Sequence, residues 1–148
     1  MESGVDSVSR SLPFGAVVVW DALTDPVLLQ GWLAPAATPV VDDALVIALD
    51  GVPMPAASSG SIRSIEPGRV AELDLGAAGS VRFVVEPTEA LESGRSTCRC
   101  TATAAPAHDL AARGAVAALE ARLDALHELL RGRPVEWESS TGGPGVRA

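Results

Sequence analysis

The feature that most constrains the fold is an alanine- and leucine-rich segment near the end of the chain, at about residues 107–131. Its apolar residues recur at spacings of three and four, which places them on one stripe of a helix. The stripe consists of Val116, Leu119, Leu123, Leu126 and Leu130. Gly132 and Pro134 follow as stop signals. Such a helix would span roughly 37 Å at 1.5 Å per residue, and its stripe requires a surface to pack on.

The preceding part of the chain supplies that surface as short strands. Runs with strand character cover 5–12, 40–41, 44–49, 61–66, 69–75, 81–86 and 95–104. Short gaps with turn residues between such runs are typical of an antiparallel meander. Pro53 and Pro55 predict a loop over 52–59, and Pro87 is predicted to end a strand. We therefore predict an α+β fold in which a long C-terminal helix crosses an antiparallel sheet of about six or seven strands.

The segment between the first two strands allows two interpretations. Residues 15–20 are rich in valine, which favours a strand, but Ala16, Val19, Trp20 and Leu23 also follow helical spacing. The next segment is clearer, because Asp25 suits an N-cap and Pro26 the first helical position. Its apolar face comprises Leu28, Leu29, Trp32 and Leu33, and Pro35 is predicted to end it.

Composition excludes several classes of partner. A chain of 148 residues with 47% hydrophobic residues has room for one globular domain. Its net charge of -8 argues against a nucleic-acid partner and against an anionic membrane surface. No apolar run is long enough to span a bilayer, and no secretory signal is visible, so a cytoplasmic location is expected. All basic residues are arginine, and lysine and tyrosine are absent.

Two motifs carry a resemblance to a known family. The first is the segment 19–26 (VWDALTDP) with 32–35 (WLAP); the second comprises 60–69, 81–87 and the final helix. The chain resembles the START-like or SRPBCC superfamily, also called helix-grip or birch-pollen-allergen-like. Within it, the chain is similar to bacterial homologues of the activator of the heat-shock-protein-90 ATPase. The resemblance covers about residues 5–133 and implies that 15–20 form a helix. Residues 134–148 are predicted to be a mobile tail, from which Trp137 could dock back.

The resemblance implies a curved sheet gripped by the last helix, with a ligand cavity between them. Such apolar cavities are the default binding sites of this kind of fold. The candidate lining residues are Trp32, Val81, Phe83, Val85, Cys98, Cys100, Ala102, His108, Val116, Leu119 and Leu123. Each also fits plain core packing, because a filled core and a cavity wall have the same composition. Ala115 stands where relatives often carry an aromatic residue.

Catalytic groups are sparse. His108 near the helix start could act as a general acid or base, although an exposed helix-start histidine is the commoner case. His127 is expected at the helix edge. Cys98 and Cys100 are interpreted as small buried hydrophobes, with a redox or metal role as the alternative. The pair Asp42 and Asp43 fits a solvated turn better than a carboxylate site. No metal-ligand spacing appears, so neither a metal nor a cofactor is expected.

The leading hypothesis is therefore a protein that binds a small hydrophobic molecule. One alternative is an enzyme of the polyketide-cyclase kind, which the absence of tyrosine makes less favourable. The other is a co-chaperone-like module that binds a protein partner. For that alternative, Glu120, Asp124 and Glu128 on the long helix could form an acidic docking strip.

Overall fold

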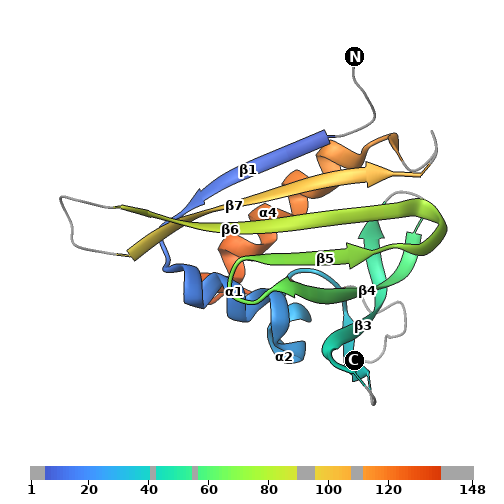
Figure 1. Ribbon diagram of the computed structural model, residues 1–148, viewed down its shortest axis with the longest axis horizontal. Helices are drawn as coiled ribbons and strands as arrows, with labels where there is room; N and C mark the ends of the chain where they lie inside the picture. The colour runs from blue at the N-terminus through green and yellow to red at the C-terminus, as the bar shows by residue number, and fades with distance from the viewer. Residues whose placement is uncertain (1–5, 41–42, 55–56, 90–95, 108–111, 138–148) are drawn as a thin grey trace.

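The computed structural model describes residues 6–40, 43–54, 57–89, 96–107 and 112–137 (Figure 1). Its strands are β1 (Asp6–Leu12), β2 (Ala36–Val40), β3 (Asp43–Met54), β4 (Ala57–Glu66), β5 (Val70–Asp74), β6 (Gly79–Glu89) and β7 (Ser96–Pro106). Its helices are α1 (Ala16–Thr24), α2 (Pro26–Leu29), the 3-10 turn η1 (Gly76–Ala78) and α4 (Ala115–Leu130). No helix of these segments is long and apolar enough to cross a membrane.

The strands form a single seven-stranded sheet in the order β1-β7-β6-β5-β4-β3-β2. Every neighbouring pair is antiparallel, so β2 to β7 form a meander and β1 closes onto β7 at one edge. Helices α1 and α4 lie behind this sheet in Figure 1, with α4 running across several strands. The predicted α+β architecture, with two short early helices and a C-terminal helix across an antiparallel sheet, is confirmed.

The two faces of the sheet differ in polarity, as strand alternation requires. On β6, Val81, Phe83 and Val85 are buried beneath the helices, at most 1% exposed. The opposite face carries polar cross-strand pairs that face away from the core. These pairs are Ser7–Thr103, Ser9–Thr101 and Arg82–Glu72. The hydrophobic core therefore lies on the helix side of the sheet.

Helices α1 and α2 are joined by a capping arrangement that the sequence predicts. The Asp25 carboxylate accepts hydrogen bonds from the backbone N–H groups of Val27 (2.8 Å) and Leu28 (3.4 Å). Pro26 follows as the first residue of α2. Proline has no N–H, so it cannot donate to the carbonyl of Ala22 four residues earlier. The indole Nε1 of Trp32 donates to that carbonyl instead, at 2.8 Å. Residues 15–20 are helical from Ala16 onward, which settles the ambiguity in favour of a helix.

The last helix begins later than predicted. The sequence suggested a start near Ala107, but β7 continues to Pro106 and the Ala107 N–H still bonds to the Ala78 carbonyl at 3.0 Å. Gly114 then adopts a φ of 74°, a left-handed conformation that a continuous helix does not allow. Helix α4 is therefore 16 residues long, about 24 Å rather than 37 Å.

Its buried stripe is also shifted. Leu119, Leu123 and Leu126 are at most 1% exposed, as predicted, but Val116 is 38% exposed. Ala115 occupies the buried position in the first turn instead, 2% exposed.

Two strands continue through residues that were predicted to end them. The predicted loop 52–59 is wrong, because β3 extends to Met54 and β4 begins at Ala57. Strand pairing is interrupted between Asp50 and Met54, so Pro53 lies where no partner needs its missing N–H. Strand β6 likewise runs past Pro87 to Glu89.

The continuation of β6 has a similar cause. The Val85 N–H points toward the β5 side of the sheet, where it bonds to the Arg69 carbonyl at 2.8 Å. Along a strand, successive backbone N–H groups point alternately to its two neighbours, so the nitrogen of Pro87 faces the same side as that of Val85, two residues earlier. Strand β5 pairs with β6 only as far as Val84, so no ladder bond is lost at Pro87.

The C-terminal residues 134–137 pack back onto the domain. The Val135 N–H donates to the Gly31 carbonyl at 2.8 Å, and the Trp137 indole donates to the Gln30 carbonyl at 2.6 Å. The Arg122 guanidinium lies 5.4 Å from the centre of the Trp137 ring. These contacts confirm that Trp137 docks back. The rest of the predicted tail, 138–148, lies outside the described residues, and the domain boundary at residue 133 stays a prediction.

Candidate functional site

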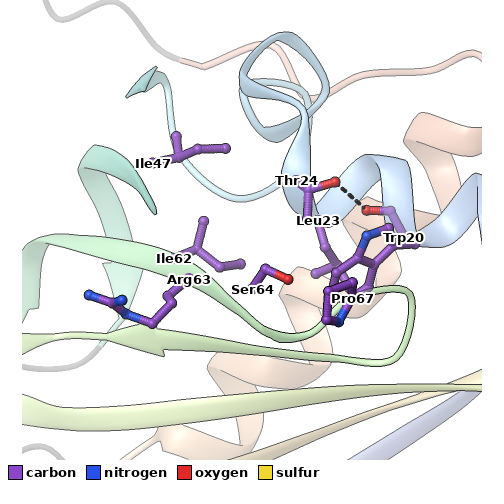
Figure 2. A pocket seen from close by; sticks show the side chains of 8 residues that line it. All are labelled: Trp20, Leu23, Thr24, Ile47, Ile62, Arg63, Ser64 and Pro67. Atoms are coloured by element: carbon purple, nitrogen blue, oxygen red, sulfur yellow. Dashed lines mark hydrogen bonds between the residues drawn. The ribbon is translucent and has the colours of Figure 1, made fainter. Parts of the chain in front are cut away.

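A pocket of about 200 Å³ lies between α1 and the β3–β4 side of the sheet (Figure 2). Its lining consists of Trp20, Leu23, Thr24, Ile47, Ile62, Arg63, Ser64 and Pro67. Five of these eight side chains are apolar, and no carboxylate, histidine or cysteine occurs among these described lining residues. The pocket is thus an apolar recess with few polar groups.

Helix α1 forms one wall of this pocket. Leu23 is fully buried, whereas Trp20 and Thr24 are half-buried at the edge of the helix. The Thr24 hydroxyl donates to the Trp20 carbonyl one turn earlier, at 3.0 Å, a bond typical of threonine in helices. This bond, drawn in Figure 2, fixes the Thr24 side chain and uses its only proton.

Strands β3 and β4 form the opposite wall. Ile47 and Ile62 are directly opposite partners in the antiparallel ladder, and both are buried. Ser64 shares the face of Ile62, because side chains two residues apart on a strand point the same way. Figure 2 shows the Arg63 guanidinium extending away from Trp20 and Leu23. Arg63 therefore borders the pocket without placing its charge inside it.

A bulge in β4 brings the turn to the rim of the pocket. The register shifts between Ser64, which pairs with Ala71, and Glu66, which pairs with Val70. Such a bulge bends the strand and is frequent beside binding sites. Gly68 completes the following turn with a φ of 83°, which glycine adopts without strain. Pro67 in this turn closes the end of the pocket beside Trp20 (Figure 2).

The residues predicted to line a cavity occupy different places. None of them is among the lining residues of this pocket. Nine are core side chains, at most 1% exposed: Trp32, Val81, Phe83, Val85, Cys98, Cys100, Ala102, Leu119 and Leu123. Val116 is exposed to 38%, and His108 lies outside the described residues. Their roles as ligand contacts stay predictions; in this structure the described ones, Val116 apart, form the packed core.

Trp32 explains why the space beneath α4 is filled. Its ring meets Phe83 of β6 edge to face, with the ring centres 5.7 Å apart. Its carbonyl accepts a 2.6 Å hydrogen bond from the Arg122 guanidinium on α4. Trp32 therefore contacts the sheet and α4 at once and occupies the volume where a ligand cavity was expected.

Two features could have pointed to the pocket from sequence alone. Trp20, Leu23 and Thr24 lie in the first resemblance motif, and Ile62 and Pro67 lie in the second. The sequence does not show that α1 and β4 lie next to each other, because β2 and β3 separate them along the chain. Nothing in the sequence singles out Ser64.

The two cysteines behave as buried hydrophobes, as predicted. Both are free and fully buried on β7. Burial raises the pKa of Cys98, and burial together with the nearby Cys98 raises the pKa of Cys100 from 9.0 to about 12. Both are therefore protonated thiols at neutral pH, which disfavours nucleophilic and metal-binding roles. Among the described residues, no cluster of three or more potential metal ligands occurs.

These thiols should make stability fall at alkaline pH. The unfolded chain loses its thiol protons near pH 9, whereas in the folded chain the pKa of Cys98 is raised and that of Cys100 is raised to about 12, so their stabilising contribution is complete below about pH 9 and decreases above it. The sequence contains no lysine or tyrosine that would titrate in this window. We expect the free energy of unfolding, measured by chemical denaturation, to decrease from pH 9 to pH 11. The variant Cys98→Ala/Cys100→Ala should show a flatter profile; equal slopes would contradict the prediction.

Other titratable groups are engaged elsewhere. His127 on α4 is half-buried, with its ring 6.0 Å from that of Phe14. On the acidic strip, Asp124 pairs with Arg10 at 3.2 Å, and Glu128 pairs with Arg131 and Arg133. These pairs partly neutralise the strip. Asp42 and the side chain of Asp43 lie outside the described residues.

The comparisons with known proteins identify the fold. No protein-family model and no curated protein matches the chain. Among solved structures, SSP2350 from Staphylococcus saprophyticus matches with a TM-score of 0.64 at 16% identity, over 89% of this chain and 96% of its own. The architecture is a helix-grip fold. At such identities the likeness shows the fold alone.

Two further solved structures that resemble this chain are of larger proteins. DynU16, a protein in the dynemicin biosynthetic locus, matches with a TM-score of 0.57 at 17% identity, over 92% of this chain and 51% of its own. CalU16 from Micromonospora echinospora matches with a TM-score of 0.55 at 18% identity, over 88% of this chain and 76% of its own. The chain thus spans about half the length of DynU16.

Proposed function

We propose that the protein binds a small hydrophobic molecule in the pocket between α1 and β3–β4. The apolar lining of this pocket is the observation that carries the proposal. Leu23, Ile47 and Ile62 present apolar walls, and the Trp20 ring adds an aromatic surface. Concave apolar sites with a few polar groups are the usual form of small-molecule sites. The ligand class is the one predicted from the sequence, a small hydrophobic molecule. The proposed site differs, because it lies between α1 and β3–β4 and not between the sheet and α4.

The helix-grip fold supports a further proposal, that the chain is a START-like SRPBCC protein. The first resemblance motif supports this assignment, because its residues form and hold together the two short helices of the fold. Asp25 caps α2, Pro26 begins it, and Trp32 supplies the hydrogen bond that Pro26 cannot. The similarity to bacterial homologues of the heat-shock-protein-90 ATPase activator thus rests on residues that build the fold. A protein partner of the co-chaperone kind has weaker support, because the acidic strip is partly paired within the chain.

An enzyme of the polyketide-cyclase kind is the second candidate. The fold of DynU16, from a dynemicin biosynthetic locus, supports it. The pocket favours binding instead, because the lining residues that the structure describes offer no carboxylate, histidine or cysteine for proton transfer. Its volume of about 200 Å³ is also below the roughly 300–1,000 Å³ of pockets that hold drug-sized molecules. A multi-ring substrate would not fit inside it.

Toluene is a suitable probe of the proposed site. We expect backbone amide signals of α1 and β4 to shift when the full chain is titrated with toluene and followed by NMR. A dissociation constant of about 0.1–1 mM is reasonable for a ligand this small. Ser64→Phe would place a ring in the pocket and should weaken toluene binding by at least about tenfold, because the added ring occupies the space of the ligand.

Ser59→Phe is the matched control. It makes the same change on the same strand, but Ser59 is exposed and three residues from Ile62, so it faces away from the pocket. It should leave toluene binding unchanged. Equal toluene binding by the two variants would overturn the proposal, as would failure of the wild-type chain to bind both toluene and its hydroxylated analogue phenol. Circular dichroism of both variants shows whether each is folded.

A further inference from the structure

The two hydroxyl groups of the pocket are not equivalent. The proton of Thr24 is engaged with the Trp20 carbonyl, so that hydroxyl can only accept another hydrogen bond. Ser64 is half-buried, and no hydrogen bond of its hydroxyl occurs within the described part of the chain. It can both donate and accept. Ser64 is therefore the polar group that remains to be satisfied when the pocket is filled.

Filling the pocket with a purely apolar molecule would leave this hydroxyl without a partner. A buried polar group without a hydrogen bond is costly, and losing such a bond reduces affinity by about tenfold or more. A ligand that carries one hydrogen-bonding group next to Ser64 avoids this loss. The remainder of its surface has to be apolar, since it faces Leu23, Ile47 and Ile62.

The charge of the ligand is constrained as well. Among the described residues of the lining, Arg63 is the only charged one, and its guanidinium points away from Trp20 and Leu23 (Figure 2). An ionised group inside the pocket would lose its hydration without gaining an opposite charge, which is strongly unfavourable. The ligand is therefore neutral.

The volume limits its size. An apolar cavity of about 150 Å³ accepts a benzene molecule, and this pocket measures about 200 Å³. One six-membered ring with a small substituent fills that space. The half-buried Trp20 at its edge offers a flat surface for such a ring.

We infer that the pocket selects a neutral, single-ring molecule whose one hydrogen-bonding group meets the Ser64 hydroxyl. This inference rests on the proposed function and adds the class of ligand to it. The ring lies between α1 and the Ile47–Ile62 pair, and its polar substituent is directed toward β4.

Three probes of similar size test this inference: toluene, phenol and benzoate. Phenol is neutral at pH 7 and adds a hydroxyl to the ring, whereas benzoate adds a charge. We expect wild-type protein, titrated by NMR, to bind phenol at least as tightly as toluene and benzoate at least about tenfold more weakly. In Ser64→Ala, the ratio of phenol affinity to toluene affinity should fall about tenfold. Ser59→Ala, with the same change on the outer face of β4, should keep the wild-type ratio.

The outcomes separate this inference from the function on which it rests. Toluene binding with an unchanged phenol-to-toluene ratio in Ser64→Ala would overturn the inference and leave the proposed function intact. Benzoate binding as tight as phenol binding would overturn the assignment of a neutral ligand. Failure of both toluene and phenol to bind the folded wild-type chain would overturn the proposed function and the inference with it.

Discussion

Replacing Trp32 by alanine is expected to lower the free energy of unfolding by about 3–5 kcal/mol, the usual cost of removing a large buried aromatic side chain. Trp32 is fully buried, packs edge to face on Phe83 and donates to the Ala22 carbonyl. A domain of this size is stable by only about 5–15 kcal/mol, so the variant should lose a substantial fraction of its stability. Urea denaturation followed by far-ultraviolet circular dichroism measures the change.

Trp32→Phe separates packing from hydrogen bonding at this position. The phenyl ring keeps much of the packing against Phe83 but cannot donate to the Ala22 carbonyl, which Pro26 also leaves unpaired. Because this carbonyl would then have no hydrogen-bond donor, we expect the free energy of unfolding to decrease by about 1–3 kcal/mol. If Trp32→Phe were as stable as the wild type, the hydrogen bond would not have the role assigned to it.

Replacing Leu123 by alanine is expected to cost about 2–5 kcal/mol. Leu123 is fully buried in the middle of α4, where the helix packs on the sheet. Removing its isobutyl group loses buried apolar surface and leaves a cavity that the tightly packed neighbours only partly fill. The midpoint of urea denaturation should decrease. The slope should change little, because the surface that becomes exposed on unfolding is similar in the variant and in the wild type.

Val116→Ala is the control on the same helix. Val116 belongs to the stripe predicted from sequence but is 38% exposed. Its truncation should change the free energy of unfolding by less than about 0.5 kcal/mol, as for most surface positions. If both substitutions lowered the free energy of unfolding equally, Val116 would be buried like Leu123, as the sequence stripe predicts, and the orientation of α4 in this structure would be contradicted.

The sequence predicted the elements more reliably than their limits. Asp25 and Pro26 predict the start of α2 because capping depends on groups within a few residues of each other. The start of α4 was misplaced because the alanines of this region have high helix propensity, whereas β7 continues to Pro106, the Ala107 N–H bonds to the Ala78 carbonyl and Gly114 adopts a left-handed φ. Pro53 and Pro87 were misread for a related reason. Whether a strand tolerates proline depends on what lies beside its nitrogen.

Whereas the helical state of 15–20 was implied by the resemblance, local patterns determined the α+β class, the strands and the last helix, and the inward-facing Leu119, Leu123 and Leu126 of α4. These follow from periodicity and capping, which act between residues close in the chain. Only the tertiary structure decided that Trp32 fills the space beneath α4 and that the open pocket lies between α1 and β4. Whether an apolar residue fills a core or lines a cavity depends on how side chains from distant segments fit together, and composition is the same in both cases.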